Sequence, residues 1–123
     1  MKMFRKEEGF TLVELMVVVL IIGILVAIAV PVFNSAKANA QKKSCWANER
    51  TVEGAYQTWQ ADNQGAATPV ANPTTYAGMV TLLEPNYVKS APTCPAAGTY
   101  SATFTGTGGE AVTVSCTTHS THP

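Results

Sequence analysis

The feature that most constrains this chain is an uncharged apolar run near its start, which extends from Leu15 to Phe33. As a helix with a rise of about 1.5 Å per residue, these 19 residues span roughly 28 Å, close to the ~30 Å hydrocarbon core of a bilayer. All of the isoleucines lie inside this run (Ile21, Ile22, Ile24 and Ile28). An ordinary soluble enzyme does not distribute its core in this way, so the run predicts a membrane-spanning segment.

Composition argues against two other classes of protein. The formal net charge is +0 and only 13% of residues are charged, so the chain lacks the basic surplus typical of nucleic-acid binding. The sequence contains no G-x-S-x-G elbow, phosphate-binding loop, dinucleotide fingerprint or paired catalytic carboxylates. We therefore expect no catalytic residues, no direct nucleic-acid partner and no enzymatic activity.

The apolar run alone is compatible with a secretory signal peptide or with a plain single-pass anchor. Residues 27–29 (Ala-Ile-Ala) match a signal-peptidase site, but the run exceeds the 7–15 residues of a signal peptide's apolar region. Glu14 also lies close before the longest apolar stretch. Basic residues flank the run on both sides: Lys2, Arg5 and Lys6 before it, and Lys37, Lys42 and Lys43 after it. The positive-inside rule would keep the short leader in the cytoplasm.

Residues 6–15 distinguish between these alternatives. Their sequence, Lys-Glu-Glu-Gly-Phe-Thr-Leu-Val-Glu-Leu, closely resembles the prepilin peptidase motif of the type IV pilin family. The resemblance implies that a membrane-embedded aspartic peptidase removes residues 1–9 by cutting between Gly9 and Phe10. It also implies that the new amine of Phe10 is N-methylated.

Glu14 acquires a role from the same resemblance. A carboxylate at the edge of a membrane helix is costly and needs a partner or a function. In the family, this carboxylate neutralises the terminal ammonium of a neighbouring subunit during assembly, and pairing offsets the cost of burying both charges. The implied partners are identical subunits in a helical homopolymer, the prepilin peptidase, the membrane before assembly, and an inner-membrane assembly platform with its ATPase-driven machinery.

Gly23 and Pro31 interrupt the apolar run. Proline removes a helical hydrogen bond and clashes with the carbonyl four residues earlier, so we expect a kink or loosening at Pro31, and Gly23 lowers helix stability further. Membrane helices often tolerate both residues. The resemblance implies that filament subunits lose helical order between such positions when they pack.

Beyond the apolar run, the pattern predicts an amphipathic helix. One face carries residues at a spacing of three or four, namely Cys45, Asn48, Val52, Ala55, Tyr56 and Trp59. The charged residues Lys42, Lys43, Glu49, Arg50 and Glu53 are expected mostly elsewhere, with Glu49 and Glu53 forming an unfavourable like-charge pair. We predict one helix from about Phe10 to about Asp62, ended by Asp62-Asn63-Gln64-Gly65.

The remaining residues predict a small β-sheet head. Residues 66–78 are expected to form a loop, and residues 79–83 a short apolar patch. Residues 99–104 and 111–116 are predicted strands of a hairpin that turns at 106–109 and carries Val112 and Val114 on one face. The predicted fold class is α+β. Its parts are a leader (1–9), a transmembrane and polymerisation segment (10–36), and an amphipathic helix with a globular head (37–123).

The cysteines are Cys45, Cys94 and Cys116. Disulfides persist outside the cytoplasm, and Cys94 and Cys116 flank the predicted hairpin, so we favour a Cys94–Cys116 disulfide. Cys45 is then a buried thiol or pairs with one of the other two. No metal site or other cofactor is expected, because no Cys-x-x-Cys or His-Glu-x-x-His spacing occurs and His119 and His122 lie in a Thr- and Pro-containing tail expected to be disordered.

The resemblance identifies the chain as a prepilin of a type IV pilus. It would be a single-pass protein of the inner membrane before assembly and part of an extracellular surface filament afterwards. A pseudopilin of a type II secretion or competence system is the alternative within the family. In some such pseudopilins, backbone carbonyls bind calcium. Calcium binding is therefore an open alternative here, although acidic residues are sparse. A membrane-anchored binding domain that never polymerises is the alternative from another class.

The processing site gives a direct test. Mass spectrometry of the mature N-terminus is expected to show a chain that begins at methylated Phe10. A mature protein that retains residues 1–9 would favour the non-polymerising anchor instead.

Overall fold

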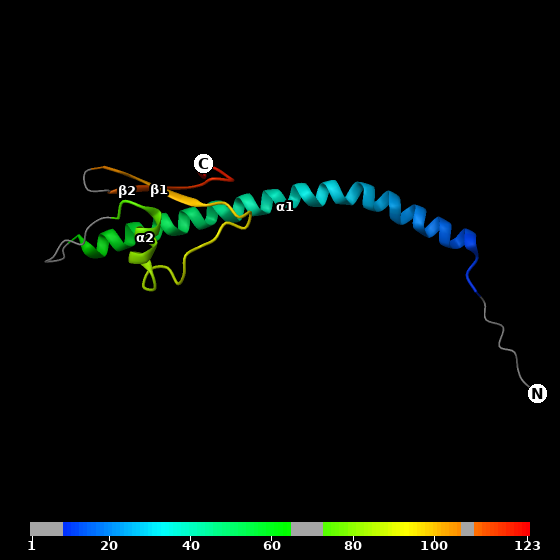
Figure 1. Ribbon diagram of the computed structural model, residues 1–123, viewed down its shortest axis with the longest axis horizontal. Coiled ribbons are helices and arrows are strands. Elements are labelled where there is room, and N and C mark those ends of the chain that lie inside the picture. Colours follow the sequence, from blue (N-terminus) through cyan, green and yellow to red (C-terminus); the bar gives the residue numbers. More distant parts are fainter. Residues whose placement is uncertain (1–8, 65–72, 107–109) are drawn as a thin grey trace, which may run out of the picture. The chain divides into compact units, whose positions relative to one another are not determined.

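The computed structural model describes residues 9–64, 73–106 and 110–123 (Figure 1). Along the chain it contains α1 (Leu12–Asn63), α2 (Tyr76–Leu83), β1 (Tyr100–Thr105) and β2 (Ala111–Cys116). The predicted α+β class, with one long helix and an antiparallel hairpin, is confirmed. The chain divides into two compact units, residues 1–37 and 38–123, which are described separately.

The first unit consists of the N-terminal part of α1. Its large apolar side chains lie on the surface, from Phe10, which is 84% exposed, to Phe33, which is 67% exposed. The helix is long and apolar enough to cross a membrane, and it continues through Pro31 without leaving the helical conformation. Because exposed apolar surface of this extent is unfavourable in water, this unit requires a lipid or protein environment.

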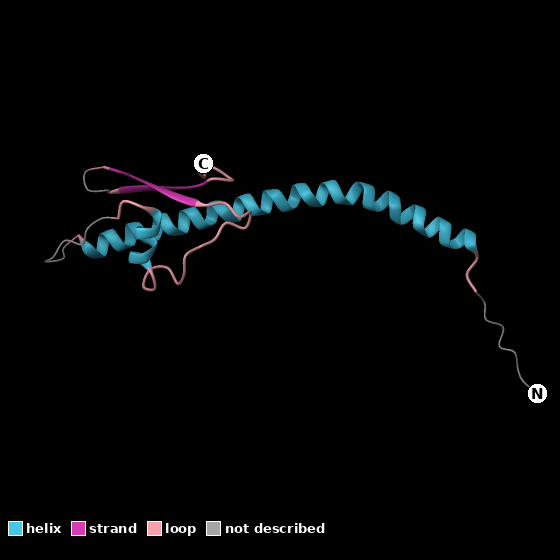
Figure 2. Ribbon diagram, viewed as in Figure 1, coloured by secondary structure: helices cyan, strands magenta, loops and turns pink. Residues whose placement is uncertain are grey.

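In the second unit, β1 and β2 form a two-stranded antiparallel sheet (Figure 2). The register pairs Tyr100 with Cys116 and Phe104 with Val112. Val112 and Val114 are both buried, which confirms the predicted inward face of the hairpin. β1 is followed by Gly106, whose φ of 92° is accessible to glycine at little cost. Residues 107–109 of the predicted turn lie outside the described residues.

The structure corrects the prediction for the segment before the hairpin. Residues 76–78, predicted as loop, belong to α2, and the apolar patch at 79–83 completes that helix. Thr75 forms the N-cap, since its hydroxyl accepts a hydrogen bond from the Gly78 amide at 3.2 Å. The part of the predicted loop at 66–72 falls outside the residues that the structure describes.

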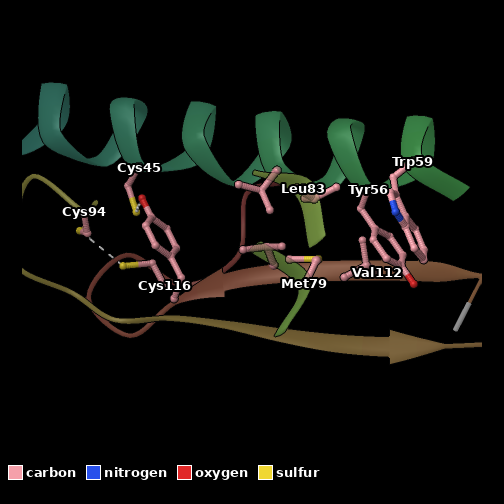
Figure 3. Packing of buried hydrophobic residues seen from close by; sticks show 11 residues of the cluster. Cys45, Tyr56, Trp59, Met79, Leu83, Cys94, Val112 and Cys116 are labelled. Atoms are coloured by element: carbon pink, nitrogen blue, oxygen red, sulfur yellow. Dashed lines mark hydrogen bonds between the residues drawn. The ribbon is translucent and has the colours of Figure 1, made fainter. Parts of the chain in front are cut away.

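The core lies between one face of α1, α2 and the hairpin (Figure 3). Tyr56 stacks on Trp59 with ring centroids 5.6 Å apart and meets Phe104 of β1 edge-on at 5.7 Å. The buried residues of α1 are Cys45, Glu49, Val52, Tyr56 and Trp59. The predicted apolar face is thus largely confirmed, but the prediction that Glu49 lies elsewhere is wrong, because its side chain is fully buried.

The packing of α2 predicts how two adjacent leucines differ. Leu83 is fully buried in the core, whereas Leu82 is only partly buried. Leu83→Ala is expected to lower the free energy of unfolding of the head by about 2–5 kcal/mol through lost burial and a cavity. Leu82→Ala, which removes the same atoms, should cost clearly less. Denaturation followed by tryptophan fluorescence measures both, since Trp59 lies in the core, and equal losses would contradict the packing described here.

Candidate functional site

The predicted cleavage site lies just before α1. Gly9 and Phe10 precede the first helical residue, and both are exposed. A Cβ atom built on Gly9 would have no neighbour within 4 Å. The described residues around Gly9 therefore do not require glycine at this position.

The start of α1 is closed by a reciprocal pair of hydrogen bonds between Thr11 and Glu14. The Thr11 amide donates to Glu14 Oε2 at 2.9 Å, and the Glu14 amide donates to Thr11 Oγ1 at 3.3 Å. This is a capping box, in which two amides at the helix start find acceptors. In the single chain, the Glu14 carboxylate thus already stabilises the first turn of the helix. This turn follows closely after the Gly9–Phe10 bond, whose cleavage would release the Phe10 amine.

The other predicted assembly residues lie further along α1. Gly23 and Pro31 are inside the helix, and a Cβ atom on Gly23 would meet nothing within 4 Å. The structure of a single chain does not bring either residue to Glu14. Their roles in assembly stay predictions.

In the head, His122 lies between two carboxylates of α1. Its Nδ1 atom lies 3.2 Å from Glu49 Oε2, and its Nε2 atom lies 3.3 Å from Glu53 Oε2. The His122 amide also donates to Glu49 Oε2 at 3.0 Å. Both ring nitrogens of His122 therefore lie within reach of a carboxylate oxygen of α1. The tail is therefore ordered against α1, and its predicted disorder is wrong.

Glu53 also connects α1 to the hairpin. Its Oε1 atom accepts a hydrogen bond of 2.7 Å from the Val114 amide of β2. An amide of a two-stranded sheet that points away from the partner strand needs such an acceptor. Glu49 and Glu53, which were expected away from the packed face of the helix, thus fix the positions of β2 and of the tail.

The three cysteines, two of which are predicted to form a disulfide, lie close together and are not bonded to one another in this structure (Figure 3). The sulfurs of Cys94 and Cys116 are 3.5 Å apart, and the Cys45 thiol donates to the Tyr100 hydroxyl at 3.4 Å. Burial raises the pKa of Cys45 to about 12. Burial also acts to raise the pKa of Cys94, but hydrogen bonds from the Ala96 and Gly98 amides and from the other thiols lower it to about 7. The Cys94–Cys116 disulfide stays a prediction.

Comparison with known proteins links this architecture to a family. A family model for the prokaryotic N-terminal methylation motif matches residues 4–30. Competence protein ComGC of Bacillus subtilis is 32% identical over 89 residues, and the match covers 72% of this chain and 82% of ComGC. The chain belongs to the type IV pilin-like family.

Two other relatives match smaller shares of their own lengths. Type II secretion system core protein G of Escherichia coli K12 is 35% identical over 95 residues, which cover 77% of this chain and 57% of that protein. Fimbrial protein EcpB of Eikenella corrodens is 58% identical over 36 residues, which cover 29% of this chain and 23% of that protein. This pilin-like chain therefore spans little more than half the length of the secretion protein. No solved structure matches it.

Family membership decides two general points. Pilin-like proteins are structural and not enzymes, in agreement with the sequence analysis. The motif together with the apolar N-terminal helix implies anchoring in the inner membrane.

The sequence analysis missed two groupings in the head of this pilin-like protein. It did not place His122 between Glu49 and Glu53, although the repeated carboxylates on a helix signalled a need for a cation. It also did not predict that His119 would join the three cysteines within 4.8 Å. The Cys116-x-x-His119 spacing was the available indication of this cluster. The other two members, Cys45 and Cys94, come from distant segments of the chain.

The contacts of His122 predict its contribution to stability. His122→Ala is expected to lower the free energy of unfolding by about 1–3 kcal/mol, because it leaves the buried Glu49 carboxylate without its side-chain partner. Arg50→Ala removes an exposed contact to the same tail, a hydrogen bond of 3.1 Å to the Pro123 carbonyl, and should change stability little. Denaturation of the two variants measures the difference, and in a Glu49→Gln background the effect of His122→Ala should shrink. An unchanged effect in that background would contradict the contact.

Proposed function

We propose that this chain is a pseudopilin-type subunit, processed by prepilin peptidase, of a filament that belongs to a competence or type II secretion system. The subunits would polymerise through residues 10–36, with the head of residues 38–123 on the outside. The assembly platform and ATPase of such a system would be its partners. The sequence analysis preferred a surface pilus, and the comparisons support its alternative better.

The observation that carries this proposal is the extent of the match to ComGC. A match over 82% of that competence protein includes more than the N-terminal motif, which the family model places within residues 4–30. Similarity that continues past the motif indicates a related head. The head is the part in which filaments of different systems differ in function. The secretion relatives support the same class over a smaller share of their length.

The fimbrial match carries less weight. Its 36 residues are fewer than the 52 residues of α1 alone. A segment of that length does not report on the fold or partners of the head. A surface pilus therefore remains an outcome of the test and not the conclusion.

Assembly would depend on the charge of Glu14. The carboxylate caps α1 through Thr11, and it can accept additional hydrogen bonds because a carboxylate offers about four acceptor sites. An incoming subunit could therefore pair its Phe10 ammonium with Glu14 of a neighbour while the helix start remains closed. In an apolar environment an unpaired charge is strongly unfavourable, so only subunits in the correct axial position would be retained.

The test separates the charge of Glu14 from its capping role in the strain that encodes this chain. Glutamine also serves at this position of a capping box, so Glu14→Gln keeps the helix start and removes the charge. We expect Glu14→Gln to insert into the membrane and to be cleaved, yet to abolish filament assembly, and we expect the same of Glu14→Ala. DNA uptake or protein secretion, measured beside a deletion strain, should fall to the level of the deletion.

Thr11→Ala is the matched control, because it removes the capping hydroxyl and leaves the carboxylate. It should retain filaments and function. Wild-type assembly of Glu14→Gln would contradict the charge-pairing mechanism. A surface pilin would be the better assignment if deletion of the gene left DNA uptake and secretion unaffected and complementation restored long surface filaments. Electron microscopy detects such filaments.

A further inference from the structure

Four side chains with metal-binding atoms meet at one end of the head. The Sγ atoms of Cys45, Cys94 and Cys116 and a ring nitrogen of His119 all lie within 4.8 Å of one another. They come from α1, the loop before β1, the last residue of β2 and the turn after it. We propose that these residues bind one Zn²⁺ ion in a closed Cys₃His site that crosslinks the head. This inference is independent of the filament system to which the subunit belongs.

The distances around Cys94 suit a tetrahedral ion. With Zn–S near 2.3 Å and Zn–N near 2.0–2.1 Å, two sulfurs lie about 3.8 Å apart and a sulfur and a nitrogen about 3.6 Å apart. In the structure, Cys94 Sγ lies 3.5 Å from Cys116 Sγ and 3.6 Å from His119 Nδ1. Because no pair in the cluster exceeds 4.8 Å, the remaining sulfur–sulfur distances need to shorten by about 1.0 Å at most and the sulfur–nitrogen distances by about 1.2 Å at most to reach tetrahedral values.

The loop that carries Cys94 is shaped around its sulfur. The Ala97 amide donates to the Cys94 carbonyl at 3.0 Å, and Ala97 adopts a left-handed φ of 57°. This tight turn directs the amides of Ala96 and Gly98 at the Cys94 side chain. Hydrogen bonds from amides to a thiolate stabilise the charge that a metal-bound cysteine carries.

Gly98 lets this turn approach the second sulfur. A Cβ atom at this position would lie 2.5 Å from Cys116 Sγ and 2.5 Å from Thr118 Oγ1. Since no real Cβ atom tolerates such contacts, only glycine allows the backbone to lie over the cluster. The close approach covers the cluster from solvent on the side of this loop, as expected for a structural metal site.

The remaining two ligands are also positioned by their surroundings. The Ser120 amide donates to the Cys116 carbonyl at 2.9 Å, which closes the turn that brings His119 back toward Cys94. The Tyr100 hydroxyl lies 3.4 Å from Cys45 Sγ and accepts a hydrogen bond of 3.2 Å from Asn48 Nδ2. The tyrosine hydroxyl can then donate to the Cys45 thiolate, a contact of the kind that orients metal ligands.

Four protein ligands fill a tetrahedral zinc ion and leave no open position, so the site is structural and not catalytic. A Cys94–Cys116 disulfide is the competing arrangement, but it would leave Cys45 and His119 without a role. The three cysteines are buried and His119 is half-buried, which leaves the ion a route of entry at the histidine. Small cores gain much of their stability from such an ion, because binding free energy adds to folding free energy.

The test uses the full chain in detergent, reduced and freed of metal, and titrated with Co²⁺ and then Zn²⁺. We expect tetrahedral cobalt absorption with thiolate-to-cobalt charge transfer, displacement of the cobalt by one Zn²⁺ per chain, and a higher unfolding midpoint with zinc. Protein isolated without chelator should contain about one zinc per chain by mass spectrometry. Cys45→Ser and His119→Ala should each weaken zinc binding at least ~100-fold, more than the loss of an outer-shell partner.

His122→Ala is the matched control, because it removes the other histidine of the tail and no atom of the cluster, so it should lower zinc affinity far less than His119→Ala does. Since His119 is half-buried, His119→Ala disturbs packing least, and its circular dichroism shows whether the head still folds. The proposal is overturned if a folded His119→Ala variant binds zinc as tightly as the unmodified chain. It is also overturned if alkylation without reduction reveals a Cys94–Cys116 disulfide in zinc-free isolated protein and the reduced chain gives no tetrahedral cobalt spectrum.

Discussion

The head depends on one face of α1, because the chain provides few large apolar side chains outside the N-terminal segment. Tyr56 and Trp59 form the aromatic part of the core, and Val52 packs beside them. The same face continues toward the N-terminus with Glu49 and Cys45, which are equally buried. Burial of a carboxylate and a thiol is unfavourable without suitable partners, so the hairpin, α2 and the tail are arranged around the needs of this single helix.

The parts of the fold that sequence predicted are those determined by local patterns. The apolar run and the spacing of Val52, Tyr56 and Trp59 specify a long helix, and alternation around Val112 and Val114 specifies a strand. α2 was missed because its eight residues include a glycine and β-branched residues, so packing rather than propensity determines it. The Cys94–Cys116 disulfide, expected from the compartment and from the position of both cysteines beside the hairpin, stays a prediction.

The two clusters in the head could not be predicted in the same way. Glu49 was assigned to the surface because a charged residue is rarely buried unless it is paired, and its partner His122 is supplied by the distant tail. The Cys45 sulfur meets Cys94 and Cys116 only because the hairpin folds back along α1. Contacts between residues far apart in sequence follow from tertiary packing and leave no periodic pattern. The N-terminal motif could be predicted, because its residues are contiguous in the sequence and can be identified without knowledge of the fold.

The position of both clusters on α1 has a consequence for how this helix can vary in length. Each residue turns an α-helix by about 100°, and Cys45 and Glu49 are four residues apart, so they point in nearly the same direction. One extra residue between them would rotate one cluster away from the hairpin while the other stayed in place. An insertion of about seven residues, close to two full turns, would restore the direction but separate the clusters by roughly 10 Å along the axis. The angular phase of α1 between these two residues is therefore fixed by the head, and the hydrogen bond of 3.2 Å from Gln41 Nε2 to the Pro95 carbonyl extends this restriction one turn further toward the N-terminus.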